Sequence, residues 1–503
     1  MTRTSVWLLR TGAAALFAGW AAYGLSSRKA ALVAPLVALG AFAWLSLRGS
    51  PPYGGRGSRW VPCLAVLPSL AWLGAIWAFW PGILSYDSVD QLSQVHTGEF
   101  SDWQPVGHTL LLMPIRAFGI APGVWLAAQV VVTVTLVAHA YENQRRQGLP
   151  GWGIALSALS LACAPPLIFM FATVWRDVTF AVLLLGAALA LQSSRSLSAS
   201  RLAALGFCLF GVAMVRHNGA LVAAVCVGLA CVAGALRPRQ GLGMSLVLGA
   251  AVLIARGPGF EALEVERRAG GYQVVAHHVA AHLEAGTRIE PLEASLLSSI
   301  SPLEDRWRYA CWSAFPTVFD QSFDSEAARE HETELLALAL RLAGRAPGVT
   351  GRHVWCLSRL AWAFTYRDAW LYRTDARLVD GELRYVAVNL LGLVEDSRAP
   401  GLARQLVRWQ EGLGNWVWAP GPYLFLSVFC FATVLRSEGF RLNPRVLWIV
   451  PVAANAVSLL VANVAFESRF GMPSFLLSLV WGPPLLAAAV ESAIRPLLMR
   501  NRA

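Results

Sequence analysis

The side chains best suited to catalysis in this chain gather in one short segment, between residues 86 and 108. It carries acids and histidines but no arginine or lysine: Asp87, Asp90, His96, Glu99, Asp102 and His108. Asp87 and Asp90 are three residues apart, so on a helical turn both carboxylates face one side. Neighbouring carboxylates raise each other's pKa, which suits a general base, a metal site or a cation site. The alternative is a solvated loop in which Asp87 or Ser88 caps a helix running to Val95.

Three further groups of polar residues interrupt the apolar sequence. They are Arg176 with Asp177; Arg216 with His217 and Asn218; and Glu467 with Arg469. Such residues at the ends of membrane spans are commonly interfacial anchors or ion pairs, but ionisable residues in membrane proteins also mark functional sites. Arginine suits phosphate, because its planar fork binds oxyanions bidentately. An acidic segment that meets these arginines would form a cavity with a base and an anion clamp.

The elements that must position these residues are membrane helices. The chain has 503 residues, of which 56% are hydrophobic and 14% charged, whereas soluble domains carry about 25% charged residues. Its mean hydropathy is +0.52. Apolar runs long enough to cross a bilayer recur, so we predict an all-α polytopic membrane protein with about twelve transmembrane helices. The predicted spans are 6–26, 30–47, 60–81, 121–141, 151–172, 177–193, 202–215, 219–236, 241–256, 421–437, 446–465 and 473–491.

Arginine placement predicts the orientation. With both termini in the cytoplasm, the inside loops carry clusters of arginine, and the loop from 82 to 106 falls outside with none. Arg28 and Lys29, in a very short turn, are the exception. The net charge of +11 is spread over short loops, so the lipid bilayer is the expected partner and nucleic acid is not. The expected location is the cytoplasmic (inner) membrane.

The stretch from 257 to 420 differs from the rest, because it is charged throughout and has no convincing span. Helical spacing recurs in 332–342 and 354–364. We therefore expect three domains: an N-terminal membrane domain (1–256, about nine helices, with a catalytic outer loop 82–120), a mostly helical extracytoplasmic insertion (257–420), and a three-helix C-terminal membrane segment (421–503). Cys311 and Cys356 fall in the insertion, and the sequence leaves open whether they pair.

Other motifs narrow the function. His278 and His282 have metal-compatible spacing beside His277, but no Glu follows the first histidine, so a zincin is not supported. An amphipathic helix facing the membrane is the preferred interpretation, and no metal ligands are assigned. The chain has no Walker A sequence, no Rossmann glycine fingerprint and no G-x-S-x-G elbow, which disfavours ATP-driven transport and serine hydrolysis.

The pattern resembles the GT-C class of polytopic membrane glycosyltransferases. Members of this class carry an acidic motif in the first large outer loop, and residues 87–90, with sequence Asp-Ser-Val-Asp, occupy such a place. Residues 102–108 and 216–219 also look like motifs of a bacterial membrane family that we group with this class. In many members the outer domain follows the last helix, whereas here three predicted helices come after it.

The resemblance implies inverting transfer of a sugar from a polyprenyl-phosphate donor to an acceptor outside the cytoplasmic membrane. Asp87 would be the general base, and Asp90 or Asp102 would orient the acceptor. Three arginines would hold the lipid phosphate and stabilise charge on it as it departs: Arg176, Arg216 and Arg469. The remaining candidates would line the substrate site: Trp103, His108, Asp177, His217, Asn218 and Glu467. Some members need a divalent metal; arginines could replace it here, so no cofactor is assigned and a divalent metal is left open.

Three alternatives remain. A transporter or flippase of lipid-linked saccharide would use arginines along a cavity, but the sequence has no repeat symmetry. A polymerase or ligase would also act on lipid-linked sugars, and a non-catalytic assembly protein would need no base. The sugar and the acceptor of this cell-envelope reaction (a glycan, a lipid or a protein) stay open.

Overall fold

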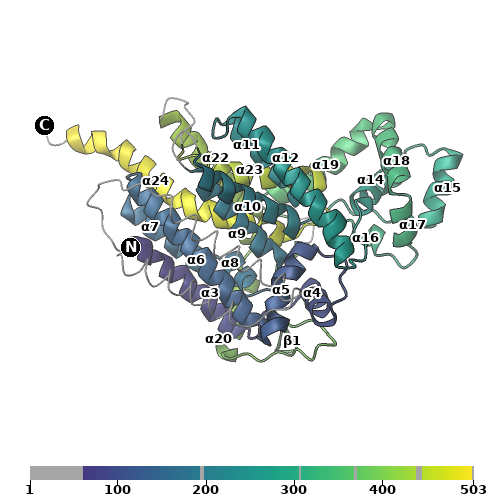
Figure 1. Cartoon of the computed structure of the whole chain (residues 1–503), viewed down its shortest axis with the longest axis horizontal. Coiled ribbons are helices and arrows are strands. Elements are labelled where there is room, and N and C mark those ends of the chain that lie inside the picture. The colour runs from purple at the N-terminus through teal and green to yellow at the C-terminus, as the bar shows by residue number, and fades with distance from the viewer. Residues whose placement is uncertain (1–60, 193–196, 305–306, 367–370, 438–443, 501–503) are drawn as a thin grey trace.

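The computed structural model describes residues 61–192, 197–304, 307–366, 371–437 and 444–500 (Figure 1). Helices dominate these residues. Their one sheet is an antiparallel hairpin of β1 (Arg377–Val379) and β2 (Glu382–Arg384). The prediction of a mainly α-helical fold is therefore confirmed for the described part of the chain. The predicted spans 6–26 and 30–47 lie outside it.

The N-terminal half is a bundle built around α9. Its elements are η1 (Val61–Ala65), α3 (Val66–Ala78), α4 (Tyr86–Thr97), α5 (Val106–Phe118), α6 (Pro122–Arg146), α7 (Gly151–Cys163), α8 (Pro165–Phe171), α9 (Arg176–Leu191), α10 (Ala199–Val215), α11 (Gly219–Val232) and α12 (Pro238–Ile254). Every residue of α9 from Asp177 onward is buried. A helix that is apolar all round is buried in protein or in lipid, and α9 is enclosed by protein, because it packs against α6, α10, α23 and α24.

Several helices fit a bilayer. Four described helices are long and apolar enough to cross one: Val61–Ala78, Pro122–Arg146, Pro238–Ala262 and Ser468–Ile494. A fifth is added if α7 and α8, bent by 59° relative to each other, form one span. The bend falls at Pro165 and Pro166, because proline lacks the N–H that would continue the helix. The chain is thus a membrane protein by helix length and composition, and the count of twelve spans stays a prediction.

The insertion packs in two ways. Its elements are η2 (Ala255–Gly259), α13 (Phe260–Ala262), α14 (Tyr272–Glu284), α15 (Pro291–Ile300), α16 (Phe315–Val318), α17 (Ser325–Glu330), α18 (Glu332–Arg345), α19 (Pro347–Trp362), α20 (Pro400–Gly412) and α21 (Asn415–Trp418). Buried residues between 272 and 342 form a hydrophobic core of their own, whereas those from 357 to 419 join the core of the bundle. The separate core, called here the outer core, forms one end of the molecule in Figure 1.

The C-terminal elements close the bundle. They are α22 (Pro420–Ser437), α23 (Ile449–Ala462), η3 (Ser468–Gly471) and α24 (Met472–Arg500). The long α24 packs against α7, α9 and α22, so the C-terminal helix lies among helices of the N-terminal half. Because η3 directly precedes α24, this packing also places η3 close to the start of α9.

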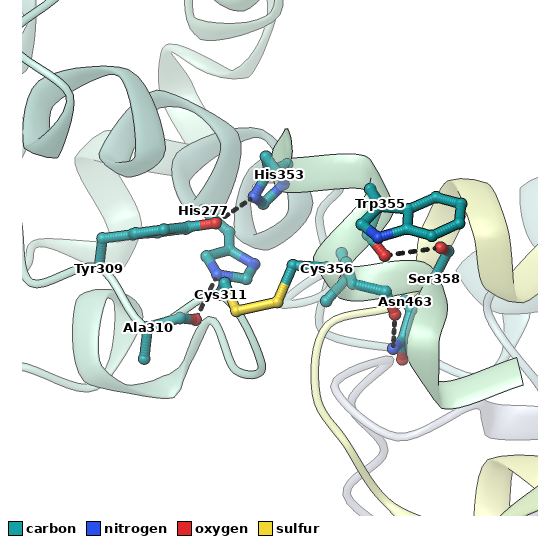
Figure 2. The surroundings of a disulfide bond; sticks show 10 residues. His277, Tyr309, Ala310, Cys311, His353, Trp355, Cys356, Ser358 and Asn463 are labelled. Carbon is teal, nitrogen blue, oxygen red and sulfur yellow. Dashed lines mark hydrogen bonds between the residues drawn. A yellow bond between two sulfur atoms is a disulfide. The ribbon is translucent and has the colours of Figure 1, made fainter. Parts of the chain in front are cut away.

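A disulfide joins Cys311 to Cys356 of α19, with 6.0 Å between their Cα atoms (Figure 2). The pairing that the sequence left open is therefore present. His277 and His353 lie near the disulfide (Figure 2), and their rings contact those of His278 and His282; these four residues are called here the histidine cluster. His277 and His282 are fully buried, so these two do not face the membrane as expected. No three His, Cys, Asp or Glu residues in the described ranges are arranged to hold a metal ion.

Candidate functional site

The start of α4 fixes the position of Asp87. Ser85 caps the helix: Ser88 N donates to Ser85 Oγ (3.2 Å) and Ser85 N donates to Ser88 Oγ (3.1 Å). Trp175 Nε1 also donates to Ser85 Oγ, at 2.9 Å, which joins this cap to the residue before α9. Because the two serines make the cap, the carboxylate of Asp87 in the first turn is left for other partners. The positive end of the α4 dipole favours its charge.

Backbone hydrogen bonds hold the segment before α4 against the segment that leads into α9. Ile83 N donates to the Ala172 carbonyl (2.7 Å), and Val174 N donates to the Ile83 carbonyl (3.2 Å). The Ser88 hydroxyl donates to the Val174 carbonyl at 2.8 Å. The helices α4 and α9 therefore begin beside each other, although 89 positions separate Tyr86 from Trp175 along the chain.

The segment before η3 is fixed by two parts of the insertion. Phe466 N donates to the Trp312 carbonyl (2.9 Å), and Tyr372 N donates to the Phe466 carbonyl (3.0 Å). Ser468 N then donates to the Tyr372 carbonyl at 2.9 Å. Glu467 lies between these bonds and Arg469 follows them, so the insertion controls where both side chains point.

Asp87 lies at the meeting point of these elements. Arg469 Nη1 is 2.6 Å from Asp87 Oδ2, and Arg176 Nη1 is 3.7 Å from the same oxygen. Gln104 Nε2 donates to the other oxygen, Asp87 Oδ1, at 3.1 Å. Both carboxylate oxygens are therefore engaged, and residues 382 positions apart in the chain form an ion pair.

A second acid lies deeper. Asp177 is fully buried; its Oδ1 is 3.1 Å from Arg216 Nη1, and its Oδ2 is 3.9 Å from Arg469 Nε. Arg469 Nε also pairs with Glu467. The structure thus brings together six of the predicted residues, called here the ion cluster: Asp87, Arg176, Asp177, Arg216, Glu467 and Arg469.

Aromatic rings enclose the guanidinium groups. Arg216 Cζ lies 5.0 Å from the Phe180 ring centroid and 4.8 Å from that of Phe470. Arg469 Cζ lies 5.2 Å from the Trp175 ring. The side chains of Arg216 and Arg469 are only 7% and 10% exposed. In such surroundings each charge interacts strongly with its neighbours, because little water screens it.

The ion cluster has unfilled hydrogen-bonding capacity. Arg176 Nη1 and Arg216 Nη1 are buried and make no well-aligned hydrogen bond, although each is near a carboxylate; both oxygens of Asp177 share this property. Buried donors without an acceptor cost stability, and native proteins rarely leave them so. An anionic ligand with several oxygens would satisfy these guanidinium donors.

The arginines also decide the charge state of Asp87. Burial alone would raise the pKa of this carboxyl, but Arg469 and Arg176 outweigh burial and lower the pKa to about 2. The expectation that neighbouring acids raise it is wrong for Asp87, because the arginines are closer. The expectation holds for Asp90, whose pKa is raised by burial and, to a smaller extent, by Asp87. Gln94 Nε2 donates to Asp90 Oδ2 at 2.9 Å.

Two candidate residues join the segment between α4 and α5 to other segments instead of entering the ion cluster. Asp102 Oδ1 accepts hydrogen bonds from the backbone N–H groups of Arg268 (2.5 Å) and Ala269 (2.7 Å), at the start of the insertion. The Trp103 ring packs edge-on against Phe319, with 6.3 Å between the centroids. These contacts fix the loop that carries Gln104, so both residues help to position the side chain that donates to Asp87.

The turn between α10 and α11 aims Arg216 into the ion cluster. A side chain on Gly219 would collide with the Val212 carbonyl, so only glycine permits this close approach of the two helices. Asn218 Nδ2 donates to Ser458 Oγ of α23 at 3.0 Å. The exposed His217 pairs through Nε2 with the Trp103 carbonyl at 3.1 Å. These two residues hold the turn, and Arg216 alone of the motif reaches the ion cluster.

The last candidate, His108, is buried and its Nδ1 lies 2.9 Å from Gln91 Oε1. Sequence reasoning missed four residues around the ion cluster: Gln104, Trp175, Tyr372 and Asp375. Gln104 follows Trp103 and Trp175 precedes Arg176 in the sequence. Their position next to candidate residues could have identified them as part of the site. Tyr372 and Asp375 have no local signal, because the insertion reaches the site only through tertiary contacts.

Comparison of the chain with protein-family models, with curated proteins and with solved structures finds no match. The site must therefore be understood from its own geometry. That geometry combines an ionised carboxylate, three arginines and unfilled guanidinium donors at the junction of α4, α9 and η3. Such an arrangement can bind a phosphate and place an acid beside it.

Proposed function

We propose that this protein is a membrane glycosyltransferase of the GT-C class. It moves a sugar from a polyprenyl-phosphate donor to an acceptor on the outer face of the cytoplasmic membrane. The observation that carries the proposal is the ion cluster, in which Asp87, in the first turn of α4, lies between two arginines from distant helix starts. Buried arginine–acid clusters are costly to fold, so a cluster with unfilled donors favours a functional explanation.

The arginines are the proposed phosphate clamp. Arg176 and Arg216 each present a buried Nη1 without a well-aligned acceptor, and a phosphate offers several acceptor oxygens. Charge-assisted hydrogen bonds from guanidinium to phosphate are the stronger kind in proteins. The same groups would stabilise the charge that grows on the phosphate as the glycosidic bond breaks.

Asp87 is the proposed general base, and phosphate binding explains how it becomes one. With Arg469 and Arg176 beside it, its pKa of about 2 makes it a weak proton acceptor. A phosphate on these arginines would neutralise their charge and repel the carboxylate, and both effects raise the pKa of Asp87. The acid would then accept the proton of the acceptor hydroxyl while the sugar moves to the acceptor oxygen and the lipid phosphate leaves.

The proposed side of the membrane is supported by the disulfide. Disulfides persist in oxidising compartments such as the bacterial periplasm and the cell surface, and Cys311 and Cys356 lie in the insertion that reaches the ion cluster. The scarcity of arginine in the first outer loop agrees with this orientation.

The test is a paired binding and transfer experiment on protein in nanodiscs. Decaprenyl phosphate is titrated against the wild type, Arg176→Gln and Asp87→Asn. In parallel, lipid-linked sugars and envelope glycans are compared by mass spectrometry in cells with the wild-type or the variant gene. Glu99→Gln, an exposed acid of the same loop, is the matched control.

We expect Arg176→Gln to weaken decaprenyl phosphate binding, and Asp87→Asn to keep binding but lose the glycan product. Transfer at the wild-type level in Asp87→Asn would refute the base. Movement of a lipid-linked sugar across the bilayer without covalent transfer would show a flippase instead.

A further inference from the structure

The insertion completes the wall of the ion cluster at Tyr372. Its backbone bonds to Phe466 and Ser468 on either side of Glu467. Its ring packs against Trp175, with 6.1 Å between centroids, and Trp175 is the ring next to Arg469. Tyr372 is therefore fixed both to the segment before η3 and to the residue before α9.

Asp375 lies next to this tyrosine. The Tyr372 hydroxyl hydrogen-bonds to the Asp375 carboxylate. One carboxylate oxygen of Asp375, Oδ2, is buried and has no hydrogen-bond partner among the described residues. Asp375 is also within the electrostatic reach of Arg469 and Asp87. The site thus holds a second acid near the proposed phosphate position, with one oxygen unused.

The two acids differ in what they can still bind. Asp87 has Arg469, Arg176 and Gln104 on its oxygens. Burial raises the pKa of Asp375, and the hydrogen bond from Tyr372 and the charge of Arg469 only partly offset this. A hydroxyl ligand that donates to Oδ2 would replace the solvation that this carboxylate has lost.

We propose that Asp375 recognises the donor sugar, accepting a hydrogen bond from a hydroxyl of a pyranose whose phosphate lies on the arginines. This inference rests on the proposed function. The sugar is joined directly to the phosphate, so a carboxylate near Arg469 lies within reach of its hydroxyls. Carboxylates suit this task, because each oxygen accepts hydrogen bonds from hydroxyl groups. Asp375 is then a specificity-determining residue that the insertion brings to the site.

The experiment separates sugar recognition from phosphate binding. Protein in nanodiscs is titrated with decaprenyl phosphate and with decaprenyl phosphate bearing glucose, mannose or galactose. The variants are Asp375→Asn and Asp375→Glu, which keeps the charge but moves it by one methylene. Asp380→Asn is the matched control: Asp380 is exposed in the turn between β1 and β2 at φ 51°, a conformation that asparagine tolerates.

In the wild type we expect at least one sugar conjugate to bind about 10-fold more tightly than decaprenyl phosphate, a factor typical of a hydrogen bond to a charged group. Both Asp375 variants should lose that advantage, keep decaprenyl phosphate affinity within about twofold, and melt like the wild type. The Asp380 control should keep the advantage.

Three results would overturn the inference: conjugates that bind no better than decaprenyl phosphate in the wild type, an advantage that survives in both Asp375 variants, or a parallel loss of decaprenyl phosphate binding in those variants. Absence of decaprenyl phosphate binding in the wild type would instead refute the proposed function itself.

Discussion

The ion cluster and the histidine cluster are both buried groups of ionisable side chains, yet they differ in charge state: one stays ionised and the other is neutral. The ion cluster keeps its charges and pairs them, and buried donors remain unfilled. The histidine cluster is neutral: burial lowers the pKa of His277 to about 4 and that of His353 to about 3. His277 Nε2 pairs with the Ala310 carbonyl, and His353 Nδ1 pairs with the Tyr309 hydroxyl (Figure 2).

From this difference we infer that the ion cluster serves the function of the protein and that the histidine cluster serves its stability. Nδ1 of His277 also lacks a hydrogen-bond partner among the described residues, but an unpaired neutral nitrogen costs far less than an unpaired charge. A charged cluster pays desolvation for every ion, and apolar residues of similar size often give equal or greater stability. We therefore infer that the charges of the ion cluster serve a ligand, and the two clusters should respond differently to substitution.

The largest effect is expected at Asp87. Asp87→Asn removes the proposed base and keeps the shape, so transfer should fall by about 10²–10⁴-fold, the usual contribution of general base catalysis. Product formation by purified protein, measured by mass spectrometry, checks this. The variant also loses the ion pair with Arg469, so its melting temperature should fall, and transfer is therefore compared per amount of folded protein. A loss of transfer that merely followed a loss of folded protein would contradict the assignment.

The next effect tests whether Asp177 and Arg216 serve stability. Arg216→Met alone leaves Asp177 buried beside fewer positive charges and should destabilise the protein by about 3–5 kcal/mol. The double variant Asp177→Leu, Arg216→Met removes both charges and should recover most of that stability without recovering transfer. Thermal melting and product formation are measured side by side. Restored activity in the double variant would show that the Asp177–Arg216 pair has only a structural role, as the histidine cluster does.

A smaller effect is expected from the disulfide. Replacing Cys311 and Cys356 by serine should destabilise the outer core by about 2–5 kcal/mol. Hydrogen exchange of peptides from α14 and α18 would report the loss, with peptides from α9 as the internal control. Because Trp312 holds Phe466 before η3, transfer should also decline moderately. Unchanged hydrogen exchange of the α14 and α18 peptides would show that the disulfide does not stabilise the outer core.

The smallest effect is a pH dependence of the outer core. The folded-state pKa values of His277, His278 and His353 are lowered, chiefly by burial, to about 4, about 4 and about 3. The unfolded chain, with histidine near pKa 6.5, binds protons first. Stability is therefore full above pH 6.5 and declines as the pH falls toward 4. Hydrogen exchange of α14 at pH 7 and 4.5, corrected for intrinsic rates, checks this, and His353→Gln should flatten the dependence.

Much of the helical layout followed from local patterns. The predicted runs 121–141, 177–193 and 219–236 coincide with α6, α9 and α11, because apolar length is a local property. The outer core was not foreseen as separate from the rest of the insertion. Which insertion residues join the bundle depends on contacts across hundreds of positions, such as Leu84 N to the Tyr385 carbonyl at 2.9 Å.

By itself, the sequence determined which groups are available: charged residues stand out in an apolar chain, and Asp87, Arg176 and Arg469 were found for that reason. Tertiary structure alone decided that these groups meet, that Asp102 lies in another contact, and that Asp375 joins from the insertion. It also set the charge state of Asp87, because Coulomb attraction and desolvation depend on distance and burial and not on spacing in the chain.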